Sequence, residues 1–233
     1  MNKDSQRAYN DRLFAKGFRS KIHYSRFYWL KSKLEKLNYV PESVLELGCF
    51  DGKTIHFLPD TIQRYVGFDA DFEGGLTLAK KIWRRSKFDF NYCTRPEDMK
   101  VNEMFDIAIC METFELINDE LLDGYVTRIA QATKGYFFVT TSNQKGIGFA
   151  SKHIIKKILG YSVPHYSLKE FFFATIGRVD KIKRSFRKGW DHQTILKIIK
   201  KHFEIIEVSR YPYNFLPGFG ICIIAKKKEE PLI

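Results

Sequence analysis

Two glycines and two acidic residues surround a sharp turn early in the chain, in the segment Val44–Thr54 (VLELGCFDGKT). Glu46 and Asp51 flank Gly48, and Gly52 follows directly; a short apolar run precedes them. A glycine-containing turn between a buried strand and a helix lets the backbone approach a ligand closely. Carboxylates at such a turn repel a pyrophosphate but suit a ligand with an ammonium or a sulfonium group.

The same turn excludes two common nucleotide-binding motifs. A dinucleotide fingerprint, G-x-G-x-x-G, needs glycines where this sequence has Phe50 and Lys53. Gly52-Lys53-Thr54 has the tail of a P-loop, but the position of the first P-loop glycine is occupied by Leu47. The turn therefore predicts another kind of ligand.

The elements that position this turn alternate between strand and helix patterns. Apolar runs of strand length, bounded by Gly, Asp, Asn or Ser, lie at Ser43–Leu47, Tyr65–Phe68, Phe88–Tyr92, Phe105–Cys110 and Gly135–Thr140. Helices are predicted at Ser25–Leu37, Glu73–Arg85 and Asp119–Thr133, and a short one after Gly52. Such alternation predicts an α/β fold with a doubly wound parallel sheet. Two more strands, Phe203–Arg210 and Phe219–Ala225, with the turn Asn214–Gly218 between them, predict an antiparallel pair.

These features resemble the class I S-adenosylmethionine-dependent methyltransferases over about residues 40–142. In that family the first strand ends in an acid-x-Gly-x-Gly-x-Gly loop. The loop maps onto Glu46, Gly48, Phe50 and Gly52, with Phe50 in place of the middle glycine. The resemblance implies a Rossmann-like, seven-stranded, mostly parallel sheet with an antiparallel last strand, and S-adenosylmethionine as the cofactor.

The resemblance also implies which residues contact this cofactor. The acid that binds the ribose hydroxyls falls on Asp69, and the segment that reaches the adenine contains Glu97 and Asp98, of which Asp98 is favoured. Met111 and Glu112 fall on the segment that lines the methyl-donor pocket. The complete implied set is Glu46, Gly48, Cys49, Phe50, Gly52, Asp69, Ala70, Glu97, Asp98, Met111 and Glu112.

The stretch after the fifth strand interrupts the alternation. We predict a basic insertion at residues 143–190 that covers the substrate, because open α/β sheets bind ligands at this edge. Ile147–Leu159 predicts an amphipathic helix with Lys152, Lys156 and Lys157 opposite its apolar side. Such a helix docks on an anionic membrane, covers a lipid-linked substrate, or packs on the core with solvated lysines. The basic cluster Lys181–Lys188 is suited to phosphates, anionic sugars or RNA.

Histidines in or just after this insertion are the candidate bases for methyl transfer. The segment Pro164–Ser167 resembles a position from which small-molecule methyltransferases reach the active site, so His165 is the predicted catalytic base. An exposed turn histidine is the alternative for His165. The predicted acceptor-binding residues are Lys152, His153, Tyr166 and His192.

Positive charge is concentrated in the C-terminal half. The chain has 39 basic and 27 acidic residues, a net charge of +12. From Lys145 to Lys228 there are 18 basic and 5 acidic residues, a net of +13, so the rest of the chain is −1. This asymmetry predicts an anionic partner, although a merely soluble basic surface is the alternative.

Composition places the chain among packed globular proteins, with 44% hydrophobic and 15% aromatic residues. We find no run of about 18 apolar residues and no secretory signal. The scattered cysteines Cys49, Cys93, Cys110 and Cys222 lack any zinc-ligand spacing, so no metal is expected. We expect a reduced, cytoplasmic protein, with peripheral contact at the inner membrane face as a further hypothesis.

The predicted organisation is a single methyltransferase domain over residues 1–233. It has an N-terminal helical cap (1–40), a cofactor-binding core (41–142), the insertion (143–190), and a last helix with two strands (191–233). The predicted function is O-methylation of a small or lipid-linked anionic acceptor such as a surface-polysaccharide sugar. The basic segment favours an RNA methyltransferase as an alternative, although nucleic acid is the less favoured partner. Phe50 and the lack of a clear base favour a non-catalytic binding protein.

Overall fold

A computed structural model describes residues 14, 17–37, 39–158, 160, 163–185, 188–211 and 219–229. The helices and strands are α2 Phe18–Lys36, β1 Ser43–Leu47, β2 Arg64–Asp69, α3 Gly75–Ile82, β3 Phe88–Tyr92, β4 Phe105–Met111, α4 Asp119–Gln131, β5 Thr133–Ser142, α5 Ile147–Ile158, α6 Leu168–Thr175, α7 His192–His202, β6 Phe203–Tyr211 and β7 Gly220–Lys227. The turn predicted at Asn214–Gly218 lies outside the described residues.

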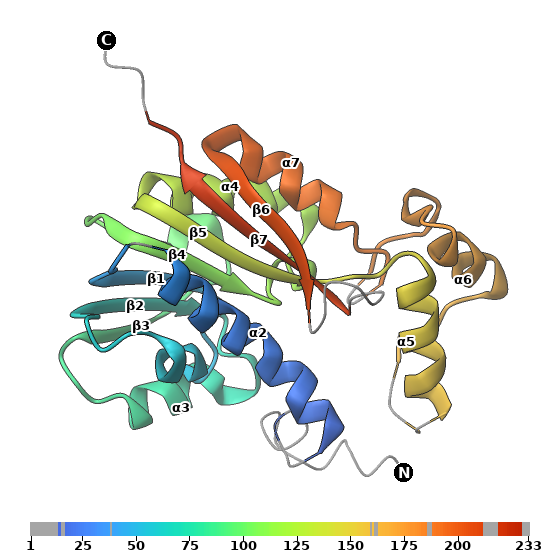
Figure 1. Ribbon diagram of the computed structural model, residues 1–233, viewed down its shortest axis with the longest axis horizontal. Coiled ribbons are helices and arrows are strands. Elements are labelled where there is room, and N and C mark those ends of the chain that lie inside the picture. The colour runs from blue at the N-terminus through green and yellow to red at the C-terminus, as the bar shows by residue number, and fades with distance from the viewer. Residues whose placement is uncertain are drawn as a thin grey trace.

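The strands form one seven-stranded sheet in the order β3-β2-β1-β4-β5-β7-β6 (Figure 1). Neighbouring strands from β3 to β5 pair in parallel, whereas β7 is antiparallel to both β5 and β6. The predicted Rossmann-like fold, with an antiparallel last strand, is confirmed.

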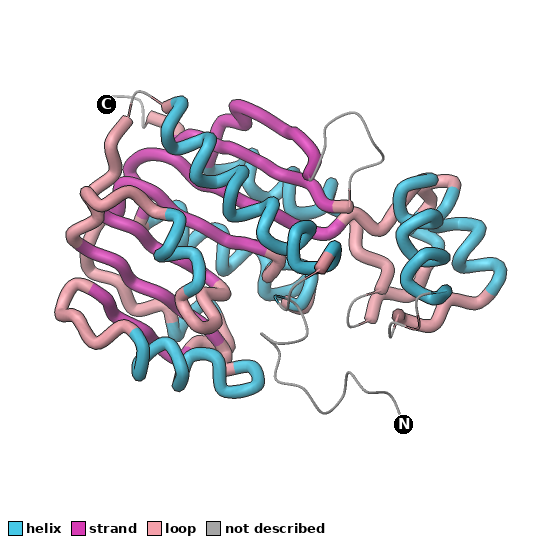
Figure 2. The backbone as a smooth tube through the Cα atoms, turned by 60° about the horizontal axis from the view of Figure 1, so that its bottom comes forward, coloured by secondary structure: helices cyan, strands magenta, loops and turns pink. Residues whose placement is uncertain are grey.

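Helices cover both faces of the sheet, because its strands are apolar on both sides. Successive residues of β1 show this alternation: Val44 packs in the core beneath α2 and α3, whereas Leu45 packs in the core beneath α4 and α7. Both side chains are fully buried. Figure 2 shows the resulting three layers.

The sheet topology brings the ends of β1, β2 and β4 to one edge. Leu47, at the end of β1, pairs with Phe68 on one side and with Cys110 on the other. Residues that directly follow these strands therefore lie side by side, at the position where open α/β sheets bind ligands.

The insertion forms a helical unit beyond this edge of the sheet, where α5 and α6 pack on each other (Figures 1 and 2). Its separate small core consists of Phe149, Ala174, Val179 and Ile182. Arg184 holds the unit to the loop after β4, because it donates to the Ile117 carbonyl (2.7 Å).

Two expectations for α5 are wrong. The apolar side at Ile154, Ile155 and Ile158 faces solvent instead of the core. Lys152 does not lie on a solvated side: its Nζ donates to the carbonyls of Asn143 and Phe219, both at 3.0 Å. Burial lowers the pKa of Lys152 to about 8.

Candidate functional site

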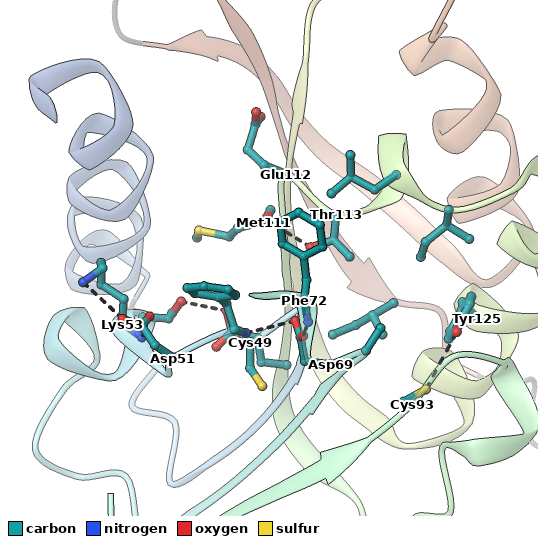
Figure 3. A pocket seen from close by; sticks show the side chains of 18 of the residues that line it. Cys49, Asp51, Lys53, Asp69, Phe72, Cys93, Met111, Glu112, Thr113 and Tyr125 are labelled. Atoms are coloured by element: carbon teal, nitrogen blue, oxygen red, sulfur yellow. Dashed lines mark hydrogen bonds and ion pairs between the residues drawn. The ribbon is translucent and has the colours of Figure 1, made fainter. Parts of the chain in front are cut away.

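A cavity of about 370 Å³ opens at the carboxyl edge of the sheet, between α2 and the loops after β1, β2, β3 and β4. Eight residues of the predicted cofactor-binding set line it: Glu46, Gly48, Cys49, Phe50, Asp69, Ala70, Met111 and Glu112. Figure 3 shows Asp51 and Asp69 at one end of this lining and Glu112 at the other.

The loop after β1 takes a path with a left-handed backbone at three predicted positions, Gly48, Phe50 and Gly52. Gly48 has φ 79°, and a Cβ there would lie 1.9 Å from Thr113 Oγ1. Phe50, at the position of the missing middle glycine, also has a positive φ, of 46°. A side chain in this conformation costs free energy, so packing must hold it. The Phe50 ring packs against Gly75, where a Cβ would lie 2.2 Å from the ring.

Glu46, near the end of β1, stabilises this loop through two side-chain hydrogen bonds. Its carboxylate is buried and accepts hydrogen bonds from Thr54 Oγ1 (2.7 Å) and from the Tyr65 hydroxyl (2.6 Å). Burial raises the pKa of Glu46 to about 7, although the two hydrogen bonds act to lower it. Gly52 does not line the cavity; its positive φ of 73° turns the chain into the 3₁₀ helix Lys53–Phe57.

Asp69 ends β2 and faces the loop after β1. Its carboxylate accepts from the backbone amides of Phe50 (3.1 Å) and Phe72 (3.3 Å). Burial raises the pKa of Asp69, and these amide hydrogen bonds oppose the shift. Each carboxylate oxygen has a second lone pair, so the group can still accept hydrogen bonds from a ligand in the cavity.

Glu97 and Asp98, the predicted adenine contacts, do not line the cavity. The Asp98 carboxylate accepts from the amides of Thr94 and Arg95, both at 2.9 Å, and these bonds lower its pKa. The Asp98 carboxylate thus stabilises the turn formed by residues 94–98. The cavity wall at this end contains Leu116 and Ile117, from the segment that resembles the methyl-donor pocket lining. It also contains residues that the sequence did not single out for the site: Cys93, Thr94, Leu121 and Tyr125.

Glu112 follows β4 with a left-handed backbone conformation (φ 54°). Its amide donates to the Thr140 carbonyl (2.8 Å), and its Oε1 accepts from the Tyr211 hydroxyl at the end of β6 (2.5 Å). Burial and the nearby Glu112 carboxylate raise the pKa of Tyr211 well above its ordinary value, so the phenol stays protonated and remains a donor.

Arg26 on α2 contributes positive charge to the same cavity. Its side chain is 8% exposed, and its Nε is buried without a hydrogen-bond partner. Among the described residues, no carboxylate forms an ion pair with Arg26. A buried guanidinium needs an anionic partner, so the site is suited to a ligand carboxylate or phosphate.

Arg26 was missed in the sequence, although its spacing gives a signal. It lies four and eight residues before Leu30 and Leu34, which are buried, so it occupies the apolar side of the helix. A charged residue on such a stripe indicates a buried site. Phe14 and Phe27 also line the cavity, but an apolar residue in or near a helix carries no comparable signal.

The predicted base His165 does not line the cavity. Its side chain is exposed, and its carbonyl accepts from Lys188 Nζ (3.2 Å). The insertion packs around its own small core, and His165 lies on the outside of this unit.

The predicted acceptor-binding residues also lie outside the lining. His153 packs against Phe149 and Tyr166 within the insertion, and burial lowers its pKa. His192 begins α7, where burial lowers its pKa to about 4. The Nζ of Lys152 donates to the carbonyls of Asn143 and Phe219.

In the described part of the chain, no three His, Cys, Asp or Glu side chains converge as metal ligands. The cavity instead combines carboxylates, one buried guanidinium and an apolar wall. This combination fits S-adenosylmethionine, which has a ribose diol, a purine, a sulfonium and a carboxylate. The fold and the site together define a nucleoside-binding α/β protein.

Comparison with known proteins identifies the family. A family model described as a methyltransferase domain matches residues 18–191. The chain therefore belongs to this family, and it is a class I S-adenosylmethionine-dependent methyltransferase with S-adenosylmethionine as the methyl donor. No curated protein matches the sequence.

Solved structures share the fold at low identity. Magnesium protoporphyrin IX methyltransferase from Synechocystis PCC 6803, with bound SAH, is 16% identical (TM-score 0.62; 93% of this chain and 92% of that chain covered). A methyltransferase from Clostridium acetobutylicum ATCC 824 is 16% identical (TM-score 0.62; 95% and 96%). The N-methyltransferase NodS from Bradyrhizobium japonicum WM9 is 12% identical (TM-score 0.57; 90% and 98%). These proteins are different methyltransferases, so the shared fold leaves the acceptor open.

Proposed function

We propose that this methyltransferase transfers the methyl group to an oxygen atom of a small or lipid-linked anionic acceptor, such as a surface-polysaccharide sugar. The proposal of an oxygen acceptor rests on the position of Glu112, whose carboxylate lines the cavity and whose backbone is left-handed. Strained backbone of this kind is concentrated at functional sites. An oxygen nucleophile needs a group that removes its proton, and a carboxylate serves as such a base.

The donor end of the cavity is formed by Asp69 and the apolar wall near Tyr125. We assign Asp69 to the ribose hydroxyls, since its oxygens face the cavity beside the loop after β1. The wall formed by Cys93, Leu121 and Tyr125 suits the flat, largely apolar face of a purine. Arg26 supplies the cation for the carboxylate of the methionine portion.

We assign the acceptor end to Glu112, which lines the cavity and is held by Tyr211 from behind the lining. The Tyr211 hydroxyl holds Glu112 Oε1, so Oε2 is the atom that receives the proton from the acceptor hydroxyl. Methyl transfer from the sulfonium is an in-line displacement, for which the protein chiefly aligns donor and acceptor. Tyr211 acts as a positioning residue, because it orients the carboxylate from a different strand.

The positive charge of the insertion supports an anionic acceptor. Arg184 of the insertion donates to the carbonyl of Ile117, which lines the cavity. Most titratable residues of the insertion are basic. A carboxylate or phosphate on the acceptor would be attracted to this side of the molecule.

The decisive experiment is transfer of labelled methyl groups from S-adenosylmethionine to fractionated extract of the native cell. Glycan, lipid, RNA and protein fractions are counted separately, with the Glu112→Gln variant as the control for background. Label in the glycan or lipid-linked fraction supports the proposal. Label in the RNA fraction alone would replace it with an RNA methyltransferase, and no transfer alongside normal donor binding would favour a binding protein.

A further inference from the structure

The outer surface of the insertion exposes large apolar side chains that its small core does not use. On α5, Ile147 is 75% exposed, Ile154 48%, Ile155 50% and Ile158 78%. Ile158 lies nine residues after the buried Phe149, and at about 100° per residue this spacing places it on the opposite side of the helix. We call the four isoleucines the isoleucine face.

The neighbouring helix repeats the pattern on a second stripe. Leu168 is 92% exposed and Phe172 58%, and Ile176, directly after α6, is 52% exposed. Their spacing of four residues puts them along one side of a helix. Single exposed apolar residues are ordinary, but seven within one small unit are not.

The same unit is strongly basic. From Lys145 to Lys188 there are 11 basic and two acidic residues, a net charge of +9. Both acids are neutralised within the unit, since Glu170 pairs with Lys188 (2.8 Å) and Asp180 with Arg178 (2.9 Å). Lys156 and Lys157 are exposed on the same helix as the isoleucine face.

Exposed apolar side chains beside a net positive charge are complementary to one kind of surface. An anionic lipid bilayer offers acidic headgroups to lysines and an apolar interior to isoleucines, and basic amphipathic helices bind it lying in the interface. RNA would use the charge but not the isoleucines. In the described residues, no helix is both long and apolar enough to cross a bilayer, so a helix of this kind rests on the surface.

We propose that α5 docks the protein on anionic membranes, with the isoleucine face inserted between the lipids and Lys156 and Lys157 at the headgroups. The proposal goes beyond the methyl transfer and does not depend on it. The unit lies at the edge of the sheet where the cavity opens (Figures 1 and 2), so docking brings the cavity close to acceptors carried by lipids.

The test is co-sedimentation of the full chain with phosphatidylcholine vesicles that contain or lack phosphatidylglycerol. Binding is expected only to the anionic vesicles, with a loss at high salt. The triple variant Ile154→Ser/Ile155→Ser/Ile158→Ser should lose sedimentation, and Lys156→Gln/Lys157→Gln should weaken it. The matched control is Lys80→Gln/Lys81→Gln/Ile82→Ser on α3, which changes exposed residues of the same types and should bind normally.

Insertion into the bilayer is measured separately. A tryptophan introduced by Ile158→Trp should be quenched by brominated lipids, whereas one introduced by Ile82→Trp should not. Equal binding to neutral vesicles, unquenched Ile158→Trp, or salt-sensitive binding to generic RNA that the serine variant retains would each overturn the proposal. Labelled methyl transfer in the same preparations reports the enzymatic function independently, so failure of one does not imply failure of the other.

Discussion

The Tyr211 hydroxyl donates to Glu112 Oε1 across 99 positions of the sequence, joining the end of β6 to the end of β4. Because β7 lies between β5 and β6 and is antiparallel to both, β6 runs in the same direction as β5 and ends at the carboxyl edge of the sheet. It fixes the orientation of the one cavity carboxylate that has a left-handed backbone.

Replacement of Glu112 separates catalysis from donor binding. If Glu112 is the base, Glu112→Gln lowers turnover by about 10²–10⁴-fold, because the amide cannot accept the proton. Affinity for S-adenosylmethionine, measured by calorimetry, should change little. Tyr211→Phe should reduce turnover by roughly tenfold through loss of the hydrogen bond that orients the carboxylate.

His165→Ala distinguishes this hypothesis from the one suggested by the sequence. The exposed His165 side chain lies outside the cavity lining, so the variant should keep its turnover in the labelled-transfer assay. A large loss in His165→Ala together with normal activity of Glu112→Gln would reverse the assignment.

Asp69 is expected to contribute to donor affinity. Asp69→Ala should weaken S-adenosylmethionine binding by about 1–3 kcal/mol, because charge-assisted hydrogen bonds to the ribose are lost. Asp71→Asn is the matched control, since Asp71 is two residues away and its carboxylate accepts hydrogen bonds from the amide and hydroxyl of Thr77. Unchanged affinity of Asp69→Ala would remove Asp69 from the donor site.

The central strands β1, β2 and β4 were predictable because burial on both faces gives each one a mostly apolar run. β1 and β3 begin and end at the predicted residues. β5 extends beyond its predicted run to Thr133 and Ser142, since pairing with β4 and β7 continues past the apolar residues. α3 is shorter than predicted, beginning at Gly75, because Glu73 takes a left-handed conformation.

Only some of the cavity-lining residues could be predicted from the sequence, for a physical reason. Asp69 ends β2, and Gly48 and Glu112 directly follow β1 and β4, so their positions are fixed once the strands are known. Arg26 lines the cavity and Tyr211 bonds the lining residue Glu112, and both come from elements whose placement depends on long-range packing. The path of the insertion, which moved His165 away, depends on the small core around Phe149.

Arg26 is expected to increase the affinity only for ligands that carry a carboxylate. Arg26→Gln is expected to weaken binding of S-adenosylhomocysteine by about 10–100-fold, because a charge-assisted hydrogen bond is lost. Binding of methylthioadenosine, which lacks the amino-acid portion, should remain unchanged. Lys31→Gln, an exposed charge on the same helix, controls for net charge. Equal losses for both ligands would show that Arg26 acts on the fold of the cavity.

Glu46 makes stability depend on pH in a defined direction. Its folded-state pKa of about 7 lies above the ordinary value of 4.5, so between these pH values the folded state binds more protons than the unfolded state. Its contribution to stability is therefore fully present below pH 4.5 and is lost as pH rises through 7. The free energy of unfolding of the wild type should fall relative to Glu46→Gln by about 3 kcal/mol over this range.

Urea unfolding of both proteins at several pH values, without donor, measures this difference. Glu115 has a raised pKa of about 8 from burial and acts in the same direction, but it is present in both proteins and cancels. A difference between wild type and Glu46→Gln that stays constant with pH would mean that Glu46 is ionised in the folded state. In that case the hydrogen bonds from Thr54 and Tyr65 would outweigh the cost of burial.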